Sequence, residues 1–235
     1  IYFFSSRVSE AERALKKGMA LLEKLKSKEK ESYNYGLLAL SQAILGKKQE
    51  ALENGKKSVA LSRKCPLAEQ ATCLHFAGYT HSHFGLFKEG LDFSLEALEI
   101  ASKLENPLLA YSANFSAALG YVMKEDFIEA ENHLNRSLEF SKKMNVMVGL
   151  DWVYHILLEP HFRTLNREQF EENFNQLKKL KPLFQHSLTY QLTFLKYQGI
   201  SYLFYHDYPS AQEILQQALT HARNENIMNR VEEAR

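Results

Sequence analysis

The sequence predicts an all-α fold built as a solenoid of antiparallel helix pairs. Three observations support this prediction. Residues that favour helices, namely Ala, Leu, Glu, Lys and Gln, are plentiful, whereas only ten Gly and five Pro occur in 235 residues. Strand-like alternation of apolar and polar residues is scarce. A short pattern returns about every 40 residues, a period typical of repeat architectures.

The repeat is visible as a turn followed by an anchor position, which recurs at spacings of 40, 39, 40, 40 and 41 residues. Small residues prevail at the anchors, and also twelve residues before and seven after them, as close packing of helix pairs requires. A larger side chain stands nine residues before. The anchors are Ala11, Ala51, Gly90, Ala130, Phe170 and Ala211; the positions nine before are Gln42, His81, Tyr121, His161 and Tyr202; those twelve before are Ala39, Gly78, Ala118, Leu158 and Gly199; those seven after are Gly18, Ser58, Ala97, Ser137, Leu177 and Ala218.

Each repeat is expected to contain a first helix before the turn and a second helix through the anchor. We expect one solenoid fragment over 1–235, with IYFFSSR as the tail of a first helix. Both ends fall inside the pattern, which suggests a piece of a longer array. The expected repeats are 1–30 (partial), 31–66, 67–106, 107–146, 147–186 and 187–226, and 227–235 begins a further helix.

Local signals mark where several helices begin. Asn166 with Gln169, and Asp126 with Glu129, have the spacing of a capping box, and Pro209 suits the first turn of a helix.

The fourth repeat departs from the pattern, because Leu158, Phe170 and Leu177 replace small residues. Pro160 falls inside its first helix, where it removes a hydrogen bond and favours a kink. We therefore expect a bend in the superhelix there.

The set Gly199, Tyr202, Ala211 and Ala218 resembles the tetratricopeptide repeat family, although the consensus Trp and terminal Pro are mostly missing. The resemblance implies a right-handed superhelix whose first helices line a concave groove. The period exceeds the family's usual length of about 34 residues and is similar to that of signal-regulated bacterial transcription activators such as the maltose-regulon activator. HEAT and armadillo repeats share the longer period and stay open as alternatives.

The net charge of +1 implies no general attraction to nucleic acid, but the charge is unevenly distributed. Residues 1–64 hold 14 Lys plus Arg against 7 Asp plus Glu, and the remainder holds 15 against 21. The basic residues fall between apolar positions at helical spacing, which favours a solvated helix face over a docking patch. We expect no direct nucleic-acid binding by this fragment.

Apolar runs such as YSANFSAALGYVM stop short of the roughly 18 to 20 residues of a membrane helix, so no membrane span is expected. Cys65 and Cys73 are too few for a disulfide framework or a zinc site, which favours a cytoplasmic setting.

No pattern in the sequence indicates catalysis. A Walker loop, HExxH and GxSxG are all absent. His75, His81 and His83 invite a zinc hypothesis, but helical geometry turns His81 away from the other two. His155 and Glu159 share a helix face with Arg163, which predicts a short polar ladder rather than an acid–base pair. No catalytic residue, metal or cofactor is expected.

The family resemblance places a binding groove on the first helices. The residues with which some family members hold the terminal carboxylate of a bound chain look absent there. We predict a non-catalytic module of a larger regulatory protein. Its partner is a protein or peptide, another domain of the same chain or a small inducer. Trp152 is either a hot spot or a filler beside Pro160. The alternative is a scaffold subunit that docks partners through charged outer faces. The predicted groove residues are Tyr33, His75, Tyr79, Phe115, Trp152, His155, Glu159 and Lys196, flanked by Leu40, Leu119 and Ile200.

Overall fold

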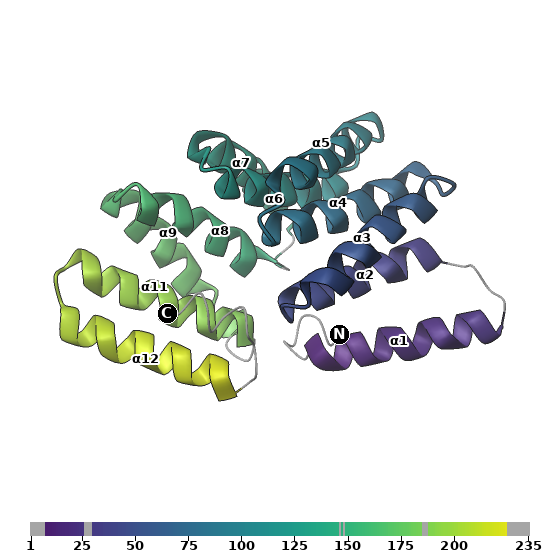
Figure 1. The fold of residues 1–235 in the computed structure, drawn as a ribbon. Coiled ribbons are helices and arrows are strands. Elements are labelled where there is room, and N and C mark those ends of the chain that lie inside the picture. Colours follow the sequence, from purple (N-terminus) through teal and green to yellow (C-terminus); the bar gives the residue numbers. More distant parts are fainter. Residues whose placement is uncertain (1–7, 26–29, 146, 148, 185–187, 225–235) are drawn as a thin grey trace. The chain divides into compact units, whose positions relative to one another are not determined.

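The computed structural model describes residues 8–25, 30–145, 147, 149–184 and 188–224 (Figure 1). Every regular element in these ranges is an α-helix. The described residues form two compact units, an N-terminal unit with α1 to α7 and a C-terminal unit with α8 to α12. Each unit is described by itself.

Helices alternate along the chain as expected for helix pairs, so the predicted all-α repeat architecture is confirmed. First helices are α2, α4, α6, α8 and α11, and second helices are α1, α3, α5, α7, α9 and α12. The N-terminal unit comprises α1 (Val8–Lys24), α2 (Glu31–Ile44), α3 (Lys48–Ser62), α4 (Leu67–His83), α5 (Phe87–Lys103), α6 (Pro107–Met123) and α7 (Phe127–Met144). The C-terminal unit comprises α8 (Leu150–Arg163), α9 (Arg167–Lys179), the short α10 (Lys181–Phe184), α11 (Leu188–Phe204) and α12 (Tyr208–Asn224).

The turn inside each helix pair has the same hydrogen-bonded form in all five pairs. One residue, five before the anchor, adopts a positive φ, and the next backbone N–H donates to the carbonyl five residues earlier, as in a Schellman motif. The positive-φ residues are Gly46, Gly85, Glu125, Leu165 and His206. The accepting carbonyls belong to Gln42, His81, Tyr121, His161 and Tyr202, at N–O distances of 2.8, 2.9, 2.9, 2.8 and 3.0 Å.

Small residues pack where the repeat predicts close contact between helices. Ala39, Ala51 and Ala118 have no exposed surface. The tightest contact joins α4 to α5, because a Cβ added to Gly78 would lie 3.0 Å from the carbonyl oxygen of Gly90. Where the fourth repeat has large residues instead, Leu158, Phe170 and Leu177 fill the same buried positions, again with no exposed surface.

The larger residue nine before the anchor pairs with the residue three after the anchor in three consecutive repeats. Gln42 Oε1 accepts a 2.8 Å hydrogen bond from Asn54. The rings of His81 and Phe93 meet edge to face at 5.1 Å, and those of Tyr121 and His133 stack at 5.2 Å. This pairing fixes the register of each second helix on its first helix.

Two of the local expectations are wrong. Asp126 makes no capping hydrogen bond, since its carboxylate lies 3.4 Å from Lys124 Nζ instead. Gly18 is exposed, and within the described part of the chain no atom of another element lies within 4 Å of a Cβ added to it. The cap at Asn166 is confirmed, because its side chain accepts from the Gln169 N–H at 3.3 Å.

Helix α8 continues through Pro160 to Arg163 without interruption. Three expectations concern how the helix pairs are arranged along the whole chain, and they stay predictions. They are the bend of the superhelix at this point, its right-handed course and the single solenoid over 1–235. The segment IYFFSSR and the helix expected over 227–235 lie outside the described residues.

Candidate functional site

The eight predicted groove residues fall into two sets, one in each unit. Tyr33, His75, Tyr79 and Phe115 belong to α2, α4 and α6 of the N-terminal unit, whereas Trp152, His155, Glu159 and Lys196 belong to α8 and α11 of the C-terminal unit. We define the aromatic face as Tyr33, His75, Tyr79, His83 and Phe115, and the polar cluster as His155, Glu159, Arg163, Thr193, Lys196 and Tyr197.

Stacked rings form the centre of the aromatic face. His75, Tyr79 and His83 recur at four-residue intervals along α4 and therefore share one side of that helix. The Tyr79 ring stacks on His83 at 5.7 Å and on Phe115 of α6 at 5.9 Å. Only 6% of Tyr79 and 8% of Phe115 is exposed, so these two rings join the helices rather than project from them.

Tyr33, His75 and His83 are the half-buried members of this face that offer contact surface beside the buried rings. Tyr33 meets the buried Phe76 edge to face at 5.8 Å. Burial lowers the pKa of His75 to about 4, against a weaker opposite effect of the Ser112 backbone, so its imidazole is neutral at pH 7. Its Nδ1 atom is buried and has no hydrogen-bond partner among the described residues.

The first helices of the N-terminal unit are almost without charge. Glu31 in α2 and Glu69 in α4 are their only charged residues, and α6 has none. In contrast, α3 carries five charged residues, and α5 and α7 carry six each. Close packing on several sides explains much of this difference, and the two charged residues, Glu31 and Glu69, are themselves half-buried.

Glu159 is the centre of the polar cluster. Its carboxylate accepts hydrogen bonds from Arg163 Nε at 2.9 Å and from Lys196 Nζ at 3.2 Å. The predicted ladder between Glu159 and Arg163 is thus present, and α11 adds a second cation. Burial alone would raise the pKa of Glu159, but Lys196, Arg163 and His155 together lower it.

Two residues of the cluster, Thr193 and Tyr197, belong neither to the predicted groove residues nor to the predicted polar ladder. Tyr197 is fully buried, and its hydroxyl lies 2.8 Å from the His155 carbonyl oxygen and 3.2 Å from Glu159 Oε2. Thr193 Oγ1 lies 3.2 Å from His155 Nδ1. Thr193 and Tyr197 are four residues apart on α11, a spacing that could have placed them on one helix face.

The aromatic face and the polar cluster offer surface for recognition. Glu159 is neutralised by two cations and is ionised near neutral pH, so it is unsuited to donate a proton. Within the described ranges, no three His, Cys, Asp or Glu side chains are placed to share a metal ion. His81, unlike His75 and His83, is fully buried, and its Nδ1 lies 2.8 Å from the Ala77 carbonyl oxygen.

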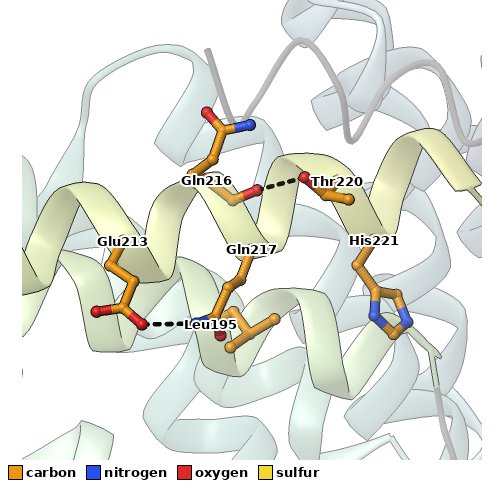
Figure 2. Close-up of a pocket in the computed structure, with 6 residues that line it drawn as sticks. All are labelled: Leu195, Glu213, Gln216, Gln217, Thr220 and His221. Carbon is orange, nitrogen blue, oxygen red and sulfur yellow. Dashed lines mark hydrogen bonds between the residues drawn. The ribbon is translucent and has the colours of Figure 1, made fainter.

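Two clefts lie away from these residues. One, of about 540 Å³, runs along α12 and is lined by Leu195, Glu213, Gln216, Gln217, Thr220 and His221 (Figure 2). Its polar side chains bond within their own helix: Gln217 donates to Glu213 at 3.3 Å, and Thr220 donates to the Gln216 carbonyl at 2.9 Å. The other, of about 620 Å³, lies between α1 and α2 and includes Met19, Leu22, Tyr35 and Lys57.

None of the described helices is both long and apolar enough to cross a membrane. No protein-family model and no curated protein matches the sequence.

Solved structures of tetratricopeptide-like repeat proteins share the fold. The apo form of RapI is 12% identical with a TM-score of 0.70, over 95% of this chain and 80% of that chain. A Rap protein complexed with Competence and Sporulation Factor is 12% identical with a TM-score of 0.72, over 99% and 69%. A Pyrococcus horikoshii signal transduction ATPase with a tetratricopeptide repeat sensor is 15% identical with a TM-score of 0.58, over 100% and 37%. These likenesses establish a tetratricopeptide-like helical repeat fold.

Proposed function

We propose that this chain is a non-catalytic interaction module that binds a protein or peptide through the first helices of its two units. The observation that carries the proposal is the ring-lined surface of α2, α4 and α6, three helices that together hold only two charged residues. Aromatic rings provide contact area at low entropic cost, and an uncharged surface is cheap to desolvate. The contact residues we propose are Tyr33, His75, Tyr79, Phe115, Trp152, His155, Glu159 and Lys196.

The C-terminal unit supports the same mode of binding. Trp152 and His155 are half-buried on α8, three residues apart and so on adjacent parts of one helix face. Beside them the charge of Glu159 is balanced by Lys196 and Arg163. A partner therefore meets rings and hydrogen-bonding groups here and no unbalanced carboxylate.

The setting we propose is cytoplasmic signalling within a larger regulatory protein, of the kind found in signal-regulated transcription activators with long repeats. Two similar structures support this setting, since one is a Rap protein complexed with Competence and Sporulation Factor and the other is a signal transduction ATPase with a repeat sensor. The partner is a peptide segment, another domain of the same chain or a small inducer, and it would act by favouring one conformation of the larger protein.

A phage-displayed random peptide library is the probe that tests this function. Peptides selected on the folded chain should bind with an affinity that Trp152→Ala or Tyr33→Ala lowers at least about tenfold, the size expected for a hot-spot ring. Tyr205→Ala is the matched control, because Tyr205 is an aromatic residue of the C-terminal unit that is 54% exposed outside the proposed contact residues. Equal losses of affinity in all three variants, or an unchanged affinity in all three, would refute the proposed surface.

A scaffold that docks partners through the second helices is the alternative function. It is favoured by one observation, the dense charge of α3, α5 and α7. Docking through charges weakens steeply between low and physiological salt, whereas binding through rings changes little. Titrating salt against the affinity of the selected peptides therefore separates the two functions.

A further inference from the structure

The cleft between α1 and α2 is a space that the next two repeats fill. Its volume of about 620 Å³ lies within the range of roughly 300 to 1,000 Å³ that is typical of small-molecule sites. On α2 its lining includes Asn34 and Tyr35, which are half-buried. Their counterparts in the next two first helices are at most 1% exposed, namely Cys73 and Leu74 in α4 and Ala113 and Asn114 in α6. The space is therefore a feature of this interface and not of the repeat in general.

Helix α1 is fixed near its N-terminus and lines the cleft further along. Glu12 is 5% exposed and accepts a hydrogen bond from Lys47 at 2.8 Å. Two turns later, Met19 and Leu22 line the cleft and are half-buried. Their counterparts in α3 are 7% and 0% exposed, namely Val59 and Ser62. The cleft thus has an apolar side that α1 supplies and no helix of this unit covers.

A pair of hydrogen-bond donors lies in the same cleft. Lys57 Nζ donates to Tyr35 Oη at 2.6 Å and lies 4.1 Å from the centre of the ring. Because the phenol oxygen accepts this bond, its own O–H remains a donor, and the ammonium keeps two further N–H groups. Together the two side chains can bind a carboxylate through charge-assisted hydrogen bonds.

Two carboxylates face the same space. Glu23 and Glu31 line the cleft, and within the described part of the chain neither is hydrogen-bonded or ion-paired. The pKa of Lys57 is raised, chiefly by its hydrogen bond to Tyr35 against a weaker effect of burial, and further by the charges of Glu31 and Glu23. The other cation of the lining, Lys16, is already engaged by Glu12 at 2.8 Å. The cleft therefore offers a free cationic donor beside free carboxylates.

We propose that this cleft binds the zwitterion of a free amino acid with a large apolar side chain. The carboxylate of the ligand meets Lys57 and Tyr35, its ammonium meets Glu31, and its side chain packs on Met19 and Leu22. A ligand with a single charge would leave either the ammonium or the carboxylates of the cleft unmatched. The site goes beyond the proposed function, because none of these residues is among the proposed contact residues.

L-Phenylalanine is the probe that tests this site in the full chain. It should bind at least about tenfold more tightly than L-phenylalanine amide, which lacks the carboxylate, and than N-acetyl-L-phenylalanine, which lacks the ammonium. Titrations followed by NMR chemical shifts measure the three affinities. Equal affinity for L-phenylalanine and either analogue, or no binding up to about 10 mM, would overturn the proposal.

Charge variants locate the binding. Lys57→Met should weaken L-phenylalanine at least about fivefold and leave the amide unchanged, whereas Glu31→Gln should weaken L-phenylalanine and leave the N-acetyl analogue unchanged. Lys17→Met and Glu53→Gln are the matched controls, because both residues are exposed charges of the same unit outside the cleft. Equal losses in the controls would place the binding elsewhere and overturn the proposal. Peptides selected on the first helices should bind all four variants equally, so this site and the proposed function can fail separately.

Discussion

At the scale of single residues, burial shifts the titration of three histidines in the N-terminal unit. His75, His81 and His133 all have a lowered pKa, and in each case burial is the largest cause. Two of them occupy positions that fix helix register: His81 lies against Phe93, and His133 lies against Tyr121. Neutral imidazoles are therefore part of the packing of this unit.

This burial predicts that the N-terminal unit loses stability in mild acid. The pKa of His75 is about 4 in the folded state and about 6.5 in the unfolded state, so the unfolded chain takes up a proton first as the pH falls. Between pH 7 and 5.5 this difference should remove about 1 kcal/mol from the free energy of unfolding, and His75→Gln should flatten the slope by that amount. Urea unfolding at several pH values measures it; an unchanged slope in the variant would contradict the assignment.

The ion pair between Glu159 and Lys196 predicts coupling between α8 and α11. Lys196→Met should lower the free energy of unfolding by about 1 to 2 kcal/mol, because the half-buried Glu159 carboxylate then loses the cation that α11 supplies. In a double-mutant cycle, Glu159→Gln combined with Lys196→Met should cost less than the sum of the single variants. Strictly additive losses, measured by chemical denaturation, would mean that the two side chains do not interact.

Part of this residue-scale detail follows from the sequence, and part does not. The contact of Glu159 with Arg163 was predictable because both lie four residues apart on one helix. The contact with Lys196 joins residues 37 apart and depends on how α8 packs on α11. The burial of Tyr79 likewise depends on Phe115 of another helix, so helix periodicity places Tyr79 on the correct side without revealing that its ring is covered.

At the scale of elements, the turn inside each pair explains how one architecture tolerates varied sequences. All five turns require a positive φ at one position, yet only Gly46 and Gly85 are glycines there. Glu125, Leu165 and His206 adopt the same conformation at an energetic cost, because a Cβ disfavours it. Hydrogen bonds common to all five turns outweigh this cost.

The turns predict opposite effects for two substitutions. Leu165→Gly should raise the free energy of unfolding by about 0.5 to 1 kcal/mol, because Leu165 has a φ of 56° and its side chain is 74% exposed. Gly85→Ala should lower it by about 1 kcal/mol through backbone strain alone, since no atom lies near an added Cβ. Thermal denaturation of both variants checks the pair; a shift of the same sign in both would contradict this explanation of the turns.

The close contact of α4 with α5 predicts that Gly78→Ala is destabilising. An added Cβ would lie 3.0 Å from the Gly90 carbonyl oxygen and 3.2 Å from the Ser94 nitrogen, so backbone atoms would have to move, at a cost of about 1 to 3 kcal/mol. Gly18→Ala is the matched control, since Gly18 is an uncrowded helical glycine whose replacement should stabilise α1 by up to about 1 kcal/mol. If chemical denaturation showed both variants to be stabilised, the close contact would be absent.

Sequence periodicity predicted which residues form the interfaces between helices, because small residues at a fixed spacing mainly serve the close packing of two helices. Capping was predicted less well. Asn106 caps α6 through the N–H groups of Leu108 and Leu109, and Pro107 follows it, whereas the predicted capping box at Asp126 does not form. A short polar side chain before a helix has several possible partners, and the choice depends on local backbone angles.

At the scale of the whole molecule, the charged residues of the N-terminal unit concentrate on its second helices α3, α5 and α7, whereas its first helices carry half-buried rings such as those of Tyr33 and His75. This division predicts that the affinity of a selected peptide changes less than about threefold between 50 and 300 mM salt, since few charges are paired on binding. Isothermal titration calorimetry at several salt concentrations measures it. A loss of a hundredfold would assign binding to the charged second helices.

The central claim, that partners bind along the first helices, is tested most directly by photo-cross-linking. A selected peptide that carries a photoreactive residue is irradiated with the full chain, and the labelled residues are identified by mass spectrometry. We predict labels on first helices, around Tyr33 and His75 in the N-terminal unit or Trp152 and His155 in the C-terminal unit. Labels confined to the charged residues of α3, α5 and α7 would contradict the claim.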